Sequence, residues 1–268
     1  MDWFFDRGGV LRLRPFERWP WLVHGFSTRA AGDVRDARAR DSFVRRVAGG
    51  DLPVATLRQV HSAIVRVVDG CLLAGFPGDS LLTAQRGVLV GVRTADCLPV
   101  LLVDPSRRAV GAVHAGWRGM SKRIVEKAAG EMRRHFGSEP EELHAAIGPG
   151  IQACCFEVGP EVLEEFACQF VEAGEFCHRE ATNPALIMLP KQIMTGGHAL
   201  MRQLDSDRGR VDLSEAARRQ LLAAGVPESQ IYSSGCCTGC DRKRFYSYRR
   251  EKEAAGRMLA VIGVRPGR

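Results

Sequence analysis

The chain has 268 residues, of which 45% are hydrophobic, a share that is ordinary for a globular protein. Its net charge is +7, but the cationic residues are scattered and aromatic residues make up only 7%. A nucleic-acid-binding protein is therefore disfavoured, and the basic surface favours anionic small ligands such as phosphate. Nine irregularly spaced cysteines argue against the disulfide framework of a small secreted protein. The N-terminus has no apolar stretch of signal length, and the apolar region 87–103 is broken by Arg93 and Asp96, so we expect a cytoplasmic protein with no membrane span.

Apolar stretches rich in Val and Leu predict strands in the first half of the chain. These strands are expected over 54–68 (one or two short strands), 87–94, 98–104 and 109–114. Cys97 and His114 therefore fall near strand ends, where a rigid scaffold meets a loop.

Three amphipathic stretches predict helices, over 121–136, 160–173 and 213–224. Ser121 is the expected N-cap of the first helix, and Gly137 should end it. Pro160 suits the first turn of the second helix, and Asp212 can cap the third.

The remaining segments complete the predicted order of elements. Further strands are expected over 143–147, 230–234 and 244–250, a strand or short helix over 257–264, and an irregular loop within 181–211. Runs of strands with separated helices favour an α+β fold over alternating βαβ units.

Three short blocks each carry one side chain of the kind that binds zinc: Arg58-Gln-Val-His61-Ser62, Thr94-Ala-Asp-Cys97-Leu-Pro99 and Gly111-Ala-Val-His114-Ala-Gly-Trp-Arg-Gly119. Two imidazoles and one thiolate can hold zinc and leave a fourth position open for water or substrate. The spacing matches neither a helical pair nor a zinc finger, so a buried apolar thiol and two unrelated histidines remain the alternative. Asp96 is a candidate acceptor that orients an imidazole, and Gly116 and Gly119 suggest a tight turn with unusual backbone angles.

These blocks resemble those of the laccase-domain family, also called YfiH-like or polyphenol-oxidase-like proteins. They occur in family order from about residue 22 to 264, at 24–29, 59–62, 78–83, 94–99, 114–119, 147–151, 154–159 and 245–250. The resemblance implies a single domain over 1–268, built as a layered α/β/β/α sandwich of mixed sheets flanked by helices. It also implies that His61, Cys97 and His114 are the metal ligands.

The family is described in conflicting terms, as a copper-dependent phenol oxidase, a purine nucleoside phosphorylase with adenosine deaminase activity, and an editing factor in peptidoglycan synthesis. The chain has seven histidines and no His-x-His pair, which is too few for a blue copper plus a three-copper cluster. A mononuclear site with two histidines and one cysteine suits hydrolytic or phosphorolytic chemistry better.

We therefore predict a zinc-dependent purine nucleoside phosphorylase with adenosine deaminase and methylthioadenosine phosphorylase activity, acting on a purine nucleoside and phosphate. Copper is the other candidate metal, because Cu²⁺ binds such sites more tightly than Zn²⁺. A copper-dependent polyphenol oxidase is one alternative. Another is a metal-free cysteine hydrolase that acts on a cell-wall precursor, with Cys97 as nucleophile and His114 as base. A non-enzymatic basic binding protein is the third, and the oligomeric state is open.

Several polar residues are candidates for binding substrate. Arg29 and Arg118 offer forked donors that match phosphate, although Arg118 can equally form a structural salt bridge. Alternation along the predicted strand 244–250 places Arg249 and Arg250 on opposite faces, so at most one reaches the pocket. Gln59 lies two residues before the first predicted ligand and is expected on the same strand face. Asp96 is a candidate catalytic acid.

The other cysteines allow several interpretations. His178-Arg-Glu followed by Cys237-Thr-Gly-Cys240 superficially resembles the zinc nucleobase deaminase pattern, but the proline before the first cysteine is missing. Cys237 and Cys240 can instead form a redox pair, or they can be loop residues whose reactive thiol has no function. The family resemblance puts Cys237 near the metal without binding it. Cys154 and Cys155 are expected to pack as small apolar residues beside Phe156.

Overall fold

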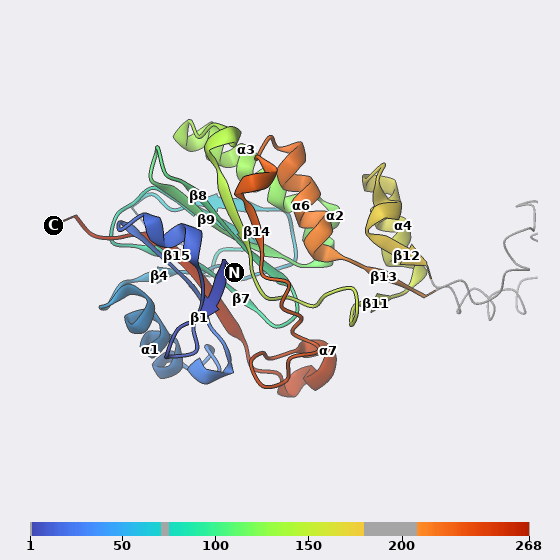
Figure 1. Ribbon diagram of the computed structural model, residues 1–268, viewed down its shortest axis with the longest axis horizontal. Helices are drawn as coiled ribbons and strands as arrows, with labels where there is room; N and C mark the ends of the chain where they lie inside the picture. Colours follow the sequence, from blue (N-terminus) through green and yellow to red (C-terminus); the bar gives the residue numbers. More distant parts are fainter. Residues whose placement is uncertain (1, 71–74, 180–207, 268) are drawn as a thin grey trace, which may run out of the picture.

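Strands from distant parts of the chain assemble into two six-stranded sheets. The computed structural model describes residues 2–70, 75–179 and 208–267 (Figure 1). The first sheet has the order β1 (Trp3–Phe5), β2 (Leu11–Leu13), β3 (Leu22–Phe26), β15 (Met258–Val264), β7 (Leu89–Thr94), β4 (Val54–Ala55). The second has the order β14 (Ile231–Ser233), β10 (His144–Ile147), β8 (Leu98–Asp104), β9 (Ala109–Ala115), β6 (Ser80–Thr83), β5 (Val65–Val67).

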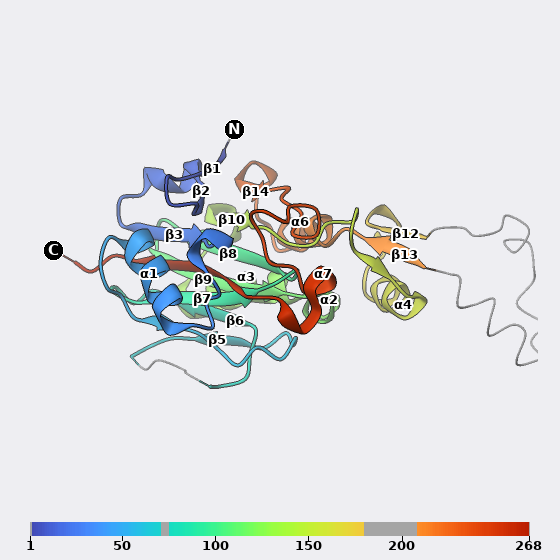
Figure 2. The same ribbon diagram turned by 90° about the horizontal axis from the view of Figure 1, so that it is seen from below.

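Both sheets are mixed. The pairs β4–β7, β5–β6 and β10–β14 are parallel, and the other neighbours in these two sheets are antiparallel. A third, three-stranded sheet consists of β11 (Glu157–Val158), β13 (Gly209–Val211) and β12 (Cys177–Arg179). Together with α4 (Pro160–Gln169), β12 and β13 gather at one end of the molecule (Figure 2).

The central strands are buried on both faces, which explains why their sequences are continuous apolar runs without alternation. In β8, Leu101 and Val103 contribute to the core between the two sheets, whereas Val100 and Leu102 contribute to the core beneath the helices. Because successive side chains of a strand point to opposite faces, one strand supplies two layers of core.

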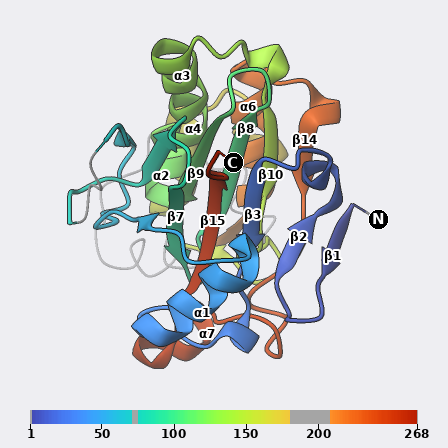
Figure 3. The same cartoon turned by 90° about the vertical axis from the view of Figure 1, so that its left-hand side faces the viewer.

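Helices cover the outer face of each sheet. Helix α1 (Ala37–Ala48) packs on the first sheet, and α3 (Ile124–Phe136) and α6 (Leu213–Ala223) pack on the second. Figure 3 shows α1 and α3 on opposite sides of the strands. The layered α/β/β/α arrangement and the single α+β domain implied by the family resemblance are confirmed.

The predicted helix 121–136 is divided in two. Helix α2 (Trp117–Ser121) ends where α3 should begin, so Ser121 closes one helix and is not the N-cap of the next. Arg123 separates them because its φ of 61° is left-handed. The predicted stop at Gly137 is confirmed, since this residue adopts the left-handed conformation after Phe136.

The other two helices match their predictions more closely. Pro160 is the first residue of α4, which ends at Gln169 and not at 173. The Asp212 carboxylate accepts a hydrogen bond from the Glu215 N–H at 2.9 Å and caps α6. Among the described residues, no helix is long and apolar enough to cross a membrane.

Most predicted strands are confirmed, but the strand expected over 244–250 is wrong. Helix α7 (Tyr248–Glu251) begins there, with the Ser247 hydroxyl accepting from the Arg250 N–H. The predicted irregular loop within 181–211 lies largely outside the described residues, and its last three residues form β13.

Candidate active site

Two loops and one strand bring the predicted ligands together. His61 lies before β5, Cys97 lies in the turn between β7 and β8, and His114 is in β9. The antiparallel register pairs Leu98 with Ala115, which places Cys97 beside the end of β9. The ligand atoms of the three residues all lie within 4.8 Å of one another. The structure therefore gathers two imidazoles and one thiol that are far apart in the sequence.

Asp79 is the buried carboxylate that orients this group. Its Oδ1 atom lies 2.9 Å from Nδ1 of His114 and also accepts from the backbone N–H of His61 at 3.0 Å. Its Oδ2 atom accepts from the backbone N–H and the hydroxyl of Ser62, both at 2.6 Å. The expectation that Asp96 orients an imidazole is wrong, because Asp79 occupies that position.

The charged forms of Cys97, His114 and Asp79 stabilise one another. Burial raises the pKa of Cys97, but the charge of His114 and hydrogen bonds from His114 and His61 outweigh it and lower this pKa to about 6. Burial lowers the pKa of His114, but Cys97 and Asp79 raise it to about 9. Burial also raises the pKa of Asp79, yet hydrogen bonds from His114 and Ser62 bring it down to about 2. Without a metal, Cys97 is thereby favoured as a thiolate paired with a protonated His114. A metal ion binds the thiolate and must displace the imidazole proton.

Two glycines let α2 lie against the ligands. A Cβ atom on Gly116 would lie 2.9 Å from Sγ of Cys97 and 3.0 Å from Cδ2 of His61. A Cβ atom on Gly119 would lie 2.8 Å from the carbonyl oxygen of Ser62. Neither glycine has a positive φ, so the expected unusual backbone angles are wrong. Close approach, and not conformational freedom, requires glycine here.

The three ligand residues line a cavity of about 770 Å³, a size typical of small-molecule sites. Its charged lining is predominantly cationic: Arg35, Arg58, Arg93, Arg118, Arg249, Lys252 and Arg257. Asp96 and Glu253 are the acidic side chains of the described lining, and apolar surface comes from Ile151, Phe156 and Tyr248. Such a concentration of positive charge raises the local concentration of anions.

Gln59 and Arg118 both reach this cavity. The Gln59 amide donates to the carbonyl oxygen of Arg93 and accepts from its N–H, each at 2.8 Å, so its polar atoms fasten the ligand loop to β7. The expected shared strand face with His61 is wrong, because His61 has a φ of 55° outside any strand. Arg118 is exposed, and its guanidinium lies 4.3 Å from the ring centre of Trp117.

Asp96 connects the cavity wall to the ligand turn. Its Oδ1 atom accepts from the Thr238 hydroxyl at 2.7 Å, and its Oδ2 atom accepts from the Arg249 N–H at 2.6 Å. Arg249 lines the cavity, whereas the guanidinium of Arg250 donates to the carbonyl oxygens of Thr238 and Gly239. One of the two adjacent arginines thus reaches the cavity, although a short helix and not strand alternation separates them.

Arg29 is not brought to the described lining of the cavity. Its Nε donates to the carbonyl oxygen of Phe245 at 2.9 Å, and its guanidinium pairs with Glu251 and lies over the ring of Tyr246. Arg29 therefore fastens the segment before and within α7 to the short 3-10 turn Arg29–Ala31 that follows β3. The expectation that it grips phosphate finds no support.

The deaminase-like pattern is not formed. Cys237 and Cys240 lie close to Cys154 and Cys155, and His178 belongs to neither of the ligand groups found among the described residues. His178 instead lies in β12, paired with β13.

Known proteins resemble this chain over nearly its whole length. The family described as multi-copper polyphenol oxidoreductase laccase matches residues 26–265. A purine nucleoside phosphorylase of Deinococcus radiodurans is 36% identical over 271 residues, which cover 93% of each chain. The adenosine deaminase RL5 of an unknown prokaryotic organism is 36% identical, covering 76% of this chain and 72% of that protein. The crystal structure of the hypothetical protein YfiH of Bacillus licheniformis is similar, with a TM-score of 0.81 and 25% identity over 98% of this chain and 99% of that one.

Proposed function

The chain belongs to this laccase-domain family, and from that premise we propose that it is a metal-dependent purine nucleoside phosphorylase with adenosine deaminase activity. The observation that carries the proposal is the position of His61, Cys97 and His114 in the wall of a cavity with a cationic charged lining. Relatives named for these two activities share 36% of their aligned residues with this chain.

Phosphorolysis needs a bound phosphate near C1′ of the nucleoside, because the phosphate oxygen forms a bond to this carbon as the bond to the purine nitrogen breaks. Guanidinium groups offer paired donors that match phosphate oxygens. Arg118 is exposed beside the ligand block, and Arg58 and Arg93 line the same cavity. We assign phosphate binding to these three arginines and to Arg249.

The apolar part of the cavity suits the purine. Phe156 and Tyr248 supply aromatic surface, and Ile151 supplies aliphatic surface. Aromatic faces favour stacking on a flat base. The same surface accepts a methylthio group in place of a ribose hydroxyl, so we include methylthioadenosine among the proposed substrates.

The donor set fits zinc. Two imidazoles and one thiolate are three ligands of a tetrahedral ion with one position left open, and Asp79 fixes the ring of His114 from behind. A bound zinc ion supplies a Lewis acid and lowers the pKa of a coordinated water toward about 7. The same donors accept copper, which is the alternative metal.

The direct test follows hypoxanthine formation from inosine with and without phosphate, before and after chelation and zinc addition. We expect turnover only with both phosphate and metal, and ammonia release from adenosine with metal alone. Cys97→Ala should lower both activities by more than the roughly 10- to 100-fold typical of removing an outer partner of a metal ligand. Cys168→Ala, at an exposed position in α4, is the matched control. Full turnover by Cys97→Ala would refute the proposal.

A cysteine hydrolase is a second candidate because Cys97, His114 and Asp79 follow one another as nucleophile, base and orienting acid do in such enzymes. The lowered pKa of Cys97 favours this role. In this case iodoacetamide in metal-free buffer should abolish turnover of a cell-wall precursor, and a chelator should leave that turnover intact. A copper polyphenol oxidase has less support, since among the described residues only His61 and His114 are histidines in a ligand group.

A further inference from the structure

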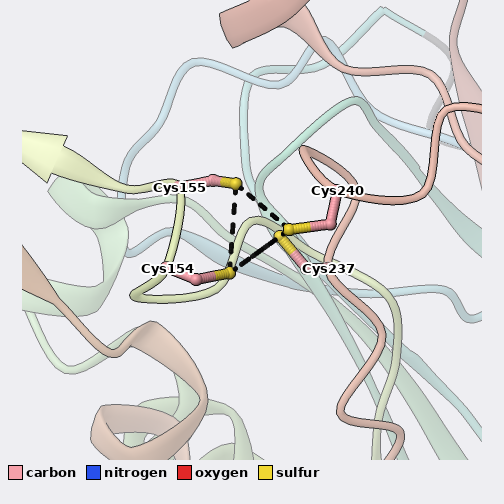
Figure 4. A group of neighbouring side chains, drawn as sticks. All are labelled: Cys154, Cys155, Cys237 and Cys240. Atoms are coloured by element: carbon pink, nitrogen blue, oxygen red, sulfur yellow. Dashed lines mark hydrogen bonds between the residues drawn. The ribbon is translucent and has the colours of Figure 1, made fainter.

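A second group of ligand side chains lies outside the cavity. Cys154 and Cys155 come from the loop between β10 and β11, and Cys237 and Cys240 come from the loop after β14 (Figure 4). All four sulfur atoms lie within 4.8 Å of one another. The expectation that Cys154 and Cys155 pack as small apolar residues beside Phe156 is wrong for Cys154, which is exposed. Cys155 does pack against the apolar core that includes Phe156, but its sulfur also lies 3.4 Å from that of Cys240.

The distances between the sulfur atoms fit a single tetrahedral ion. Sulfur atoms about 2.3 Å from a zinc ion are about 3.8 Å apart in a regular tetrahedron. Four of the six pairs here are 3.4, 3.5, 3.5 and 3.9 Å apart, and all six are within 4.8 Å. A disulfide needs about 2.05 Å. We propose that Cys154, Cys155, Cys237 and Cys240 bind one zinc ion as a closed structural site.

The backbone of both loops is shaped around the sulfurs. A Cβ atom on Gly239 would lie 2.7 Å from Cβ and 2.8 Å from Sγ of Cys155, so only glycine lets the two loops approach this closely. The Gln152 N–H donates to Sγ of Cys237 at 3.5 Å, a contact that stabilises a thiolate. Cys237 and Cys240 are two residues apart, a common ligand spacing in structural zinc sites, whereas Cys154 and Cys155 are adjacent.

Two guanidinium groups contact the backbone of the ligand loops, and one of them, Arg250, is also paired with Glu251. Four thiolates and one Zn²⁺ carry a net charge of −2, which is costly beside apolar surface unless cations are near. Arg210 donates to the carbonyl oxygen of Cys154 at 2.6 Å, and Arg250 donates to that of Gly239 at 2.8 Å. A guanidinium therefore lies on each of the two ligand loops.

The proposed ion holds the wall of the active-site cavity. Thr238, between the two ligands of the second loop, donates its hydroxyl to Asp96, the neighbour of Cys97. Its N–H donates to the carbonyl oxygen of Gly150 in the first loop. Because both loops end at residues of the cavity lining, fixing them to one ion also fixes the position of Asp96.

Metal content of the full-length protein separates this site from the catalytic one. Protein purified with zinc should carry two zinc ions per chain, Cys237→Ser/Cys240→Ser one, Cys97→Ser one, and the triple variant none. Cys168→Ser should keep two. One ion in the wild type, lost in Cys97→Ser and kept in the double variant, would overturn the proposal and leave the proposed function intact. The reverse pattern would refute the catalytic metal alone.

A cobalt spectrum tests the site without altering its cysteines, in case the double variant does not fold. Cys97→Ser protein loaded with Co²⁺ should show the intense visible bands of a tetrahedral ion and strong sulfur-to-metal charge transfer. A weak octahedral spectrum would contradict the proposal. So would iron with acid-labile sulfide in the purified protein, or disulfides among these four residues found by mass spectrometry.

Discussion

At the scale of single residues, Asp79 has the largest influence on the ligand geometry. It is fully buried, and its two oxygens contact His114, His61 and Ser62. One carboxylate thus orients the ring of His114 and holds the backbone of His61 in place. Asn at this position keeps the size of the side chain, but it replaces one acceptor oxygen of the Asp79 carboxylate with an NH2 group, which only donates.

We expect Asp79→Asn to weaken zinc binding at this site by about 10- to 100-fold, the usual effect of losing an outer partner of a metal-bound histidine. Competition with a chromophoric chelator measures the affinity. Asp104→Asn is the matched control. Asp104 is also buried, but it lies at the end of β8 that is far from Cys97. Equal affinities for the wild type and Asp79→Asn would contradict the assigned role.

The buried His24 should make the stability of the protein depend on pH. Burial, followed by the charge of Arg12, lowers its pKa to about 3, and its Nε2 accepts from the Leu13 N–H. The unfolded chain binds this proton near pH 6.5 and the folded chain only near 3, so stability is lost as pH falls between these values. The slope from this group is at most about 1.4 kcal/mol per pH unit.

Urea unfolding of wild type and His24→Gln at several pH values isolates this contribution, since other titrating groups cancel in the difference. The free energy of unfolding should fall more steeply with decreasing pH in the wild type than in the variant. Parallel pH curves for the two proteins would mean that His24 titrates normally in the folded state.

The sequence predicted that His61, Cys97 and His114 belong to one site, and the structure brings them together, but the sequence did not identify Asp79. His61, Cys97 and His114 could be recognised as zinc-type ligands at strand ends, whereas Asp79 stands 18 residues from His61 and 35 from His114 in the chain. It lies in the block 78–83 that contributes to the family resemblance, but nothing in that block shows that it orients an imidazole. Asp96 was the nearer candidate in sequence, but the tertiary structure turns it toward Thr238.

At the scale of elements, α2 shows how close contact overrides helix propensity. Alanine normally stabilises an exposed helix by about 1 kcal/mol relative to glycine. Gly130 in α3 has open space around it, whereas a Cβ atom on Gly119 would meet the backbone oxygen of Ser62. We therefore expect alanine to have opposite effects on stability at these two positions.

We expect Gly130→Ala to raise the free energy of unfolding by about 1 kcal/mol and to leave zinc affinity unchanged. Gly119→Ala should lower stability and weaken zinc binding, because the loop carrying His61 must move. Urea unfolding and chelator competition on both variants check this. Stabilisation of both proteins would show that α2 does not press on the ligand loop.

Periodicity and capping residues predicted the elements with strong local signals. Asp212 and Gly137 marked helix ends correctly. The helix 121–136 failed because Arg123 adopts a left-handed conformation, which is unfavourable for arginine and has no sequence signature. The strand 244–250 failed because the Ser247 cap outweighed an apparent alternation.

At the scale of the whole molecule, sheet pairing creates the site. The C-terminal strand β15 lies between β3 and β7, and β8 pairs with both β9 and β10. Such long-range pairings are not encoded in local patterns, so the layered architecture was available only through the family resemblance. Composition and periodicity alone gave the α+β class.

The concentration of positive charge predicts a dependence on salt. We expect the KM for phosphate to rise as ionic strength increases from about 0.01 to 0.15 M, over which the screening length falls from about 30 to 8 Å. The KM for the uncharged inosine should change little, which provides an internal control in the same steady-state assay. A phosphate KM independent of salt would mean that the arginines of the lining do not bind this anion.

The proposed activity depends on one metal ion shared by His61, Cys97 and His114. Anomalous diffraction at the zinc edge, from crystals grown with zinc, tests it most directly. We expect a peak about 2.0–2.3 Å from one nitrogen of each imidazole and from Sγ of Cys97. A clear zinc signal elsewhere in the protein with no peak among these three side chains would contradict it.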